Sequence, residues 1–220
     1  MDLRKYGRAV PDLSHERRLY RQGLRVVAGV DEAGRGPLAG PVVAAAVALP
    51  SGLTGEEEWL KKLDDSKRLT ARQREAAFDL IHEHALAVSV AEESPEEIDL
   101  IGIGRAVIRA MLRAVEGLAV APQHLLLDYV PMKECPYSYE TLVKGDSRSY
   151  SIAAASIVAK ITRDRVMERA DSLYPGYGFA RHKGYGTALH WEQLASRGPC
   201  PLHRRSFAPL RQAMLAMGDD

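Results

Sequence analysis

Two apolar segments separated by a short glycine-rich turn constrain the fold near the beginning of this chain. Residues 25–30 are apolar and β-branched, and residues 41–49 form a second apolar run. The turn between them holds Gly34, Gly36 and Gly40, and it is short enough for a hairpin. We therefore expect two buried strands joined as a hairpin.

Helical and strand patterns alternate along the rest of the chain. Ser94 and Pro95 suit the N-cap and first position of a helix, and Glu97 completes a capping box. We predict helices over residues 11–22, 70–84, 94–116, 149–173 and 187–196, and further strands over residues 85–91 and 124–127. A hairpin followed by alternating strands and helices predicts a mixed α/β sheet flanked by helices.

The composition places the chain among soluble globular proteins. Its 220 residues predict one domain over 1–220, with residues from about 187 to 220 forming a small helical C-terminal cap. A hydrophobic share of 46% excludes disordered and collagen-like chains, and two cysteines exclude a disulfide framework. The most apolar run, residues 38–49, is shorter than the roughly 20 residues that a membrane span needs. No secretory signal follows Met1, so we expect a cytoplasmic protein without a membrane partner.

The net charge of +1 hides an uneven distribution, with an acidic middle and a basic C-terminal third over residues 144–211. A basic stripe of this kind could follow a phosphate backbone. Solvated helix faces that happen to segregate are the alternative, and charge alone does not decide between the two.

Four carboxylates come from three separate segments. Asp31 and Glu32 follow the first strand, Asp128 closes the strand over 124–127, and Asp146 precedes the long helix. Adjacent carboxylates converge only if the strand ends or bends there, because side chains alternate between faces. Clustered carboxylates raise one another's pKa unless a cation lies among them, and oxygen ligands suit Mg²⁺ or Mn²⁺. The alternative is that each acid is a solvated cap.

Two loops could contact a ligand. Gly34, Arg35 and Gly36 match neither a dinucleotide fingerprint nor a P-loop, but their bare backbone could approach a ligand closely. In the loop over residues 182–187, Tyr185 could stack on a base or sugar while Lys183 meets a phosphate. A plain hairpin turn and a packing tyrosine are the alternatives. Residues His182, His190 and His203 lack zinc-site spacing, so we expect no structural zinc.

Residues 30–43 resemble the opening motif of type 2 ribonuclease H, the bacterial ribonuclease HII family. The resemblance covers about residues 25–210, and its blocks keep the family's order. After the opening motif it runs through residues 65–69, 126–128, 144–146, 151–160, 163–164, 174–175, 182–187 and 203–207. It implies a ribonuclease H-like fold, hydrolysis of the RNA strand of RNA–DNA hybrids, and incision at ribonucleotides embedded in duplex DNA.

The resemblance also assigns residues. It makes the metal-binding and catalytic carboxylates Asp31, Glu32, Asp128 and Asp146, for two divalent ions, Mn²⁺ or Mg²⁺. It makes Gly34, Arg35 and Gly36 the loop whose backbone reads the ribose 2′-hydroxyl, and Tyr185 the residue that packs on the sugar beside the cut. Lys67, within the block 65–69, and Lys183 complete the expected substrate-binding set. We expect 5′-phosphate and 3′-hydroxyl products, and a protein that acts as a monomer.

Two positions depart from the family pattern. Tyr129 follows Asp128 where the family often has glycine, and Gly102 replaces a frequent asparagine. Neither departure touches a carboxylate. Two other functions stay open at this point: a non-catalytic hybrid- or duplex-binding protein, and a carboxylate nuclease of the same fold that acts on another structure, such as a DNA junction.

Overall fold

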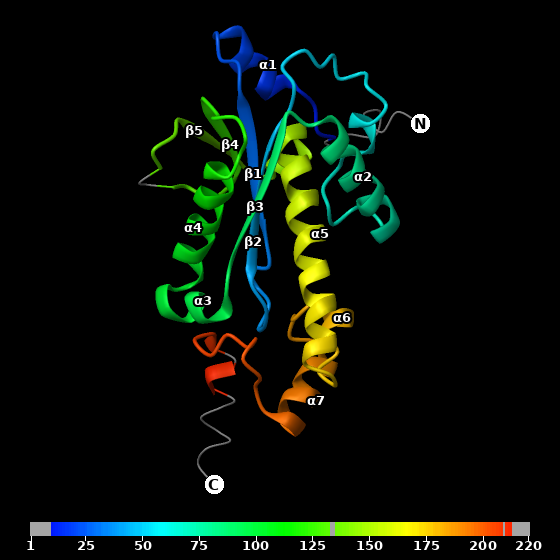
Figure 1. Ribbon diagram of the computed structural model, residues 1–220, viewed down its shortest axis with the longest axis vertical. Helices are drawn as coiled ribbons and strands as arrows, with labels where there is room; N and C mark the ends of the chain where they lie inside the picture. Colours follow the sequence, from blue (N-terminus) through cyan, green and yellow to red (C-terminus); the bar gives the residue numbers. More distant parts are fainter. Residues whose placement is uncertain (1–9, 133–134, 209, 213–220) are drawn as a thin grey trace.

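The computed structural model describes residues 10–132, 135–208 and 210–212, and its centre is one mixed five-stranded sheet with the order β3-β2-β1-β4-β5 (Figure 1). β2 lies antiparallel to β1 and β3, whereas β4 lies parallel to β1 and β5 lies parallel to β4. The strands are β1 (Val27–Ala33), β2 (Val42–Ala48), β3 (Ala87–Glu93), β4 (His124–Asp128) and β5 (Tyr139–Leu142).

Helices cover both faces of this sheet (Figure 1). Side chains alternate between the two faces of the sheet along β2. Ala44 and Ala46 therefore lie on the face that packs on α4, and Ala45 and Val47 lie on the face that packs on α5. The helices are α1 (Ser14–Arg21), α2 (Ala71–His84), α3 (Pro95–Ile101), α4 (Ile103–Glu116), α5 (Tyr150–Leu173), α6 (Phe179–His182) and α7 (Ala188–Arg197). Two short 3₁₀ segments, η2 (Leu60–Lys62) and η3 (Gly145–Ser147), complete the elements.

The long helix α5 lies against β1 because small residues permit a close approach. A Cβ atom at Gly29 would lie 2.1 Å from the carbonyl carbon of Ser151. Every residue of the small-residue run 152–159 is buried, as expected for a packing surface. The Ser149 side chain caps the helix, and the buried carboxylate of Glu16 on α1 accepts hydrogen bonds from Ser149 and Ser151.

The prediction of one helix over residues 94–116 is wrong. The chain breaks at Gly102, whose φ of 82° is left-handed, so α3 and α4 are separate helices. The first strand runs further than expected, to Ala33, so Asp31 and Glu32 lie within β1 rather than beyond its end. β5, α6 and the two 3₁₀ segments were not predicted, whereas the other predicted helices and strands agree to within a few residues at each end.

α6, α7 and the segment that follows lie at one end of the sheet, beyond the turn between β1 and β2 (Figure 1). Ala39 of that turn bridges to His203, and Asp99 of α3 accepts hydrogen bonds from the amides of Arg205 and Ser206. α7 and helical residues 210–212 fit the expected helical cap, whose last part, residues 213–220, lies outside the described residues. Among the helices of the described part, none is long and apolar enough to cross a membrane.

Candidate active site

The sheet brings the predicted acids together from neighbouring elements. Val30 of β1 pairs with Leu127 of β4, so Asp31 and Asp128 each occupy the position after the last registered pair. Asp128 accepts a hydrogen bond of 2.8 Å from the Gly145 amide, which ties β4 to η3, the segment that carries Asp146. Beyond Val30, β1 has no registered partner in β4. It stays paired with β2 as far as Ala33, so only the edge toward β4 is open there, and the adjacent residues Asp31 and Glu32 both line the cavity at this edge.

Two adjoining cavities hold these side chains. Asp31, Glu32 and Asp128 line a cavity of about 240 Å³, together with residues 34–36 and Tyr185. Asp128 and Asp146 line a second cavity of about 430 Å³, and Asp128 and Lys67 belong to both. A larger cavity of about 660 Å³ lies between η2 and α2 and includes none of the four acids. The predicted acids therefore converge on one region, and this larger cavity contains none of them.

Burial and mutual repulsion make the charged state of this cluster costly. Burial raises the pKa of Asp31, and the charges of Glu32 and Asp128 raise it further. Burial likewise raises the pKa of Glu32, and burial with the charges of Asp65 and Asp128 raises the pKa of Asp146 to about 6. Each of these pKa values is raised first by burial and further by a neighbouring negative charge.

The acid cluster fits divalent cations by its chemistry. Oε2 of Glu32 is buried and has no hydrogen-bond partner among the described residues. Among the described residues, no group of three or more His, Cys, Asp or Glu side chains is placed closely enough to hold a metal ion, so the four acids would have to move together to bind one. Hard cations with oxygen ligands would relieve the repulsion among these acids and take the free oxygen, so Mg²⁺ or Mn²⁺ suits these residues.

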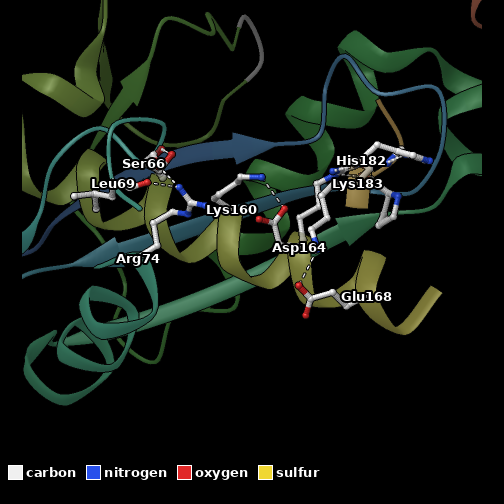
Figure 2. Close-up of polar contacts among 12 residues, drawn as sticks. Ser66, Leu69, Arg74, Lys160, Asp164, Glu168, His182 and Lys183 are labelled. Atoms are coloured by element: carbon white, nitrogen blue, oxygen red, sulfur yellow. Dashed lines mark hydrogen bonds and ion pairs between the residues drawn. The ribbon is translucent and has the colours of Figure 1, made fainter. Parts of the chain in front are cut away.

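Lys67 faces the acids. Although burial by itself lowers the pKa of its ammonium, the charges of Asp146, Asp65, Asp31 and Asp128 raise it. Arg74 of α2 holds the segment in place by donating to the carbonyls of Ser66 and Leu69 at 2.9 and 2.6 Å (Figure 2). The Ser66 hydroxyl lies 3.0 Å from the Ser156 hydroxyl of α5. Ser156 in turn hydrogen-bonds to Asp31, so this segment is part of the site.

The two predicted loop residues of the 182–187 segment go to different places. Tyr185 lines the acid cavity, and 47% of its surface is exposed, so its ring is available to a ligand. Lys183 does not line the cavity, and its ammonium pairs with Glu168 of α5 at 2.7 Å (Figure 2). The structure therefore joins Tyr185 to the acids and gives Lys183 a protein partner.

The glycine loop lies over two buried arginines that sequence reasoning did not single out. Gly34 has a φ of 93°, and a Cβ atom there would lie 1.9 Å from Nε of Arg163. The buried guanidinium of Arg204 donates hydrogen bonds to the carbonyls of Gly34 and Arg35. Both arginines stand in blocks of the family resemblance, but the sequence carries no signal that their side chains turn inward.

Both departures from the family pattern fall where the backbone is left-handed. Tyr129 has a φ of 54° and Gly102 a φ of 82°. Glycine adopts a positive φ more easily than other residues, which fits the family's glycine at position 129 and the glycine of this chain at position 102. The Tyr129 side chain is 68% exposed and lines the second cavity, so its bulk meets no core contact.

Comparison with known proteins gives a consistent result. A family model described as ribonuclease HII matches residues 28–210. The ribonuclease HII of Geobacillus kaustophilus is 52% identical over 204 residues, which cover 93% of this chain and 76% of that protein. The ribonuclease HII of Geobacter sulfurreducens is 52% identical over 197 residues, which cover 90% of this chain and 88% of that protein.

Solved structures share the fold. The ribonuclease H2 of Pyrococcus horikoshii superposes with a TM-score of 0.74 at 27% identity, covering 89% of this chain and all of that one. A ribonuclease HII from Archaeoglobus fulgidus, solved in complex with PCNA, gives a TM-score of 0.65 at 27% identity, covering 81% of this chain and 93% of the matched chain. A ribonuclease HIII solved with Mn²⁺ gives a TM-score of 0.69 at 20% identity, covering 91% of this chain and 73% of the matched chain. This likeness supports the fold alone.

Proposed function

The chain belongs to the ribonuclease HII family and is a metal-dependent endoribonuclease that acts on the RNA strand of RNA–DNA hybrids, and we propose that it also incises duplex DNA at embedded ribonucleotides. One observation carries the proposal: the acid cavity is shared with the glycine loop and with Tyr185. Recognition of one ribose beside the acids would allow the site to act on a single ribonucleotide flanked by DNA as well as on a continuous RNA strand. The family excludes a non-catalytic binding protein, and it favours this substrate over a DNA junction.

We propose that Asp31, Glu32, Asp128 and Asp146 hold two divalent ions, Mg²⁺ or Mn²⁺, which would supply charge neutralisation and Lewis-acid chemistry for phosphodiester hydrolysis. The four carboxylates would hold those ions beside the scissile phosphate, and none of the four would need to act as a nucleophile. Water is the attacking group in this scheme, because the 2′-hydroxyl is engaged by the protein. The products are then a 5′-phosphate and a 3′-hydroxyl.

Recognition of the ribose is assigned to the loop over residues 34–36 and to Tyr185. A 2′-hydroxyl is the only group that distinguishes RNA from DNA at a single nucleotide. The backbone amides of Arg35 and Gly36 can donate to it, because neither donates to an acceptor within the described chain. The Tyr185 ring packs on the neighbouring sugar, and Lys67 meets a phosphate beside the acids.

The test is cleavage of a DNA duplex that carries one ribonucleotide. The full chain is incubated with Mg²⁺, with Mn²⁺ or with chelator, and the ends are identified by their susceptibility to phosphatase and polymerase. We expect a single metal-dependent incision at the ribonucleotide, no incision of the all-DNA duplex, and cleavage of a long hybrid. Cleavage of the hybrid together with an intact single-ribonucleotide duplex would contradict the proposal.

A further inference from the structure

Arg204 is a buried cation whose hydrogen bonds all go to the backbone of the glycine loop. Its side chain is 0% exposed. Nε donates to the carbonyl of Gly40 at 2.9 Å, one terminal nitrogen donates to Arg35 at 3.1 Å, and the other donates to Gly34 at 2.6 Å. Among the ion pairs of the described residues, none includes Arg204, so these carbonyls are its direct partners.

These contacts fix the direction of two amides. In a planar trans peptide the C=O and N–H groups point in opposite directions. Because the carbonyl of Gly34 faces Arg204, the amide of Arg35 faces away from it, and the carbonyl of Arg35 turns the Gly36 amide in the same way. Both residues are exposed and line the acid cavity. Arg204 therefore holds two free donors toward that cavity.

We propose that Arg204 is a positioning residue for ribose discrimination: it sets the direction of the two loop amides that donate hydrogen bonds to the 2′-hydroxyl oxygen. This inference rests on the proposed function, since it requires that the loop reads a ribose. Arg204 itself does not touch the substrate. Its contribution is to make the donors rigid before the substrate arrives, which avoids the cost of ordering a loop on binding.

Only arginine supplies this set of contacts. Its guanidinium is planar, and its donors point in fixed directions that can reach three carbonyls at once. A lysine ammonium is a compact point charge on a flexible stem, and it cannot span the carbonyls of residues 34, 35 and 40 together. Burial and the neighbouring charge of Arg163 lower the pKa of Arg204 to about 9, so the cation is held at a cost.

Arg163 offers a matched control within the same structure. It is 1% exposed and also donates to three carbonyls, those of Pro41, Lys183 and Ala39, at 3.0, 3.0 and 3.1 Å. It joins the end of the glycine loop to the Tyr185 loop and contacts neither carbonyl that orients the two donors. Arg163→Lys therefore disturbs an equally buried guanidinium that packs against Gly34 and lines the same cavity but donates to neither carbonyl that orients the amides of Arg35 and Gly36.

The experiment measures binding by the full chain in chelator, where no cleavage occurs. Two duplexes that differ by one 2′-hydroxyl are compared, and the ratio of their Kd values is taken for each variant. We expect the wild type to prefer the ribose, Arg204→Lys to lose roughly 5- to 30-fold of that preference, and Arg163→Lys to keep it within about twofold. Affinity for the all-DNA duplex should change little in Arg204→Lys, which a merely structural role does not predict.

The outcomes separate the two proposals. A wild type without preference for the ribose contradicts ribose recognition itself. A wild-type preference that Arg204→Lys retains overturns the role of Arg204 alone. If Arg204→Lys does not fold, Asp99→Ala replaces it, because Asp99 anchors the next two residues through the amides of Arg205 and Ser206, both at 2.9 Å. We expect a smaller loss of the ratio there, about 2- to 5-fold, and an unchanged ratio would overturn the inference.

Discussion

The acid cluster and the arginine cradle differ in whether their buried polar atoms have hydrogen-bond partners. The arginine cradle consists of Arg163, Arg204 and the carbonyls they contact. In the acid cluster Oε2 of Glu32 has no hydrogen-bond partner among the described residues, and repulsion adds to burial in raising the pKa of Asp31. In the cradle, every nitrogen of both guanidinium groups donates to a carbonyl. The acid cluster thus keeps a buried oxygen of Glu32 free for a ligand, whereas the guanidinium groups of the cradle are satisfied by the protein.

Two buried histidines link the segment that carries Arg204 to Tyr185, because His203 contacts His190 and His190 contacts the Tyr185 carbonyl. The Cys200 amide donates to Nδ1 of His203 at 3.0 Å, so the His203 proton is on Nε2, which lies 3.0 Å from Nε2 of His190. The proton of His190 is then on Nδ1, which donates to the Tyr185 carbonyl at 2.9 Å. Both rings are neutral in this arrangement, and each ring nitrogen has a partner.

The largest effect should come from the acid cluster. Asp31→Asn or Asp146→Asn should lower single-turnover cleavage by about 10³-fold or more, because each removes charge that holds the cations. Substrate binding in chelator should persist, since less negative charge then faces the phosphates. Asp79→Asn, an exposed change on α2, is the matched control and should leave cleavage unchanged. Near-normal cleavage by either site variant would contradict the metal-holding role.

Tyr185 tests whether the cradle serves substrate recognition. Tyr185→Ala should lose about 5- to 150-fold in cleavage, because aromatic stacking contributes on the order of 1–3 kcal/mol. The loss should be larger at a single ribonucleotide than on a long hybrid, which offers many sites. Tyr185→Phe keeps the ring and should keep most activity. An unchanged ratio of the two cleavage rates, together with a lower melting temperature for Tyr185→Ala, would make Tyr185 a packing residue.

The two regions should respond to pH with opposite signs. Burial and the adjacent His190 lower the pKa of His203 to about 4, so between pH 6.5 and 4 the unfolded chain binds more protons and stability falls as pH falls. The pKa of Asp146 is raised to about 6, so below pH 6 the folded chain binds more protons at that site and stability rises.

Asp146→Asn removes the carboxylate whose effect on stability opposes that of His203 as the pH falls. The variant should therefore show the pH dependence of His203 more clearly. Its free energy of unfolding at pH 8 should exceed that of the wild type by on the order of 1 kcal/mol, because a buried repulsion is relieved. Between pH 6.5 and 4.5 its stability should fall more steeply than that of the wild type. Urea denaturation at several pH values measures both quantities, and parallel pH profiles for the two proteins would contradict the assignment.

The smallest effect concerns the two predicted lysines. Lys67 lies beside the acids, whereas the Lys183 ammonium is paired with Glu168. One phosphate contact adds about 0.9 to the slope of log affinity against log salt. Lys67→Gln should therefore lower the slope by about 0.9, and Lys183→Gln should leave it nearly unchanged. An equal reduction in both variants would show that the Lys183–Glu168 pair opens when nucleic acid binds.

Local sequence signals were sufficient for most elements and for the acids. Thr70, Ser94, Ser149 and Thr187 each cap the helix that follows, as their side-chain chemistry predicts. The four carboxylates stand beside apolar strands or a helix start, and the sheet brings such positions to one edge. The resemblance to ribonuclease HII then supplied the predicted roles of the glycine loop and Tyr185, which composition and periodicity could not indicate.

Only the tertiary structure decided where the buried cations and histidines lie. Arg163 and Arg204 belong to basic stretches whose pattern fits an exposed surface equally well, and their inward direction depends on carbonyls more than a hundred residues away. The same holds for His190 and His203, which meet only because the segment after α7 folds back. Sequence determines a residue's chemistry and its local backbone preference; partners distant along the chain are set by packing, because burial is a property of the whole fold.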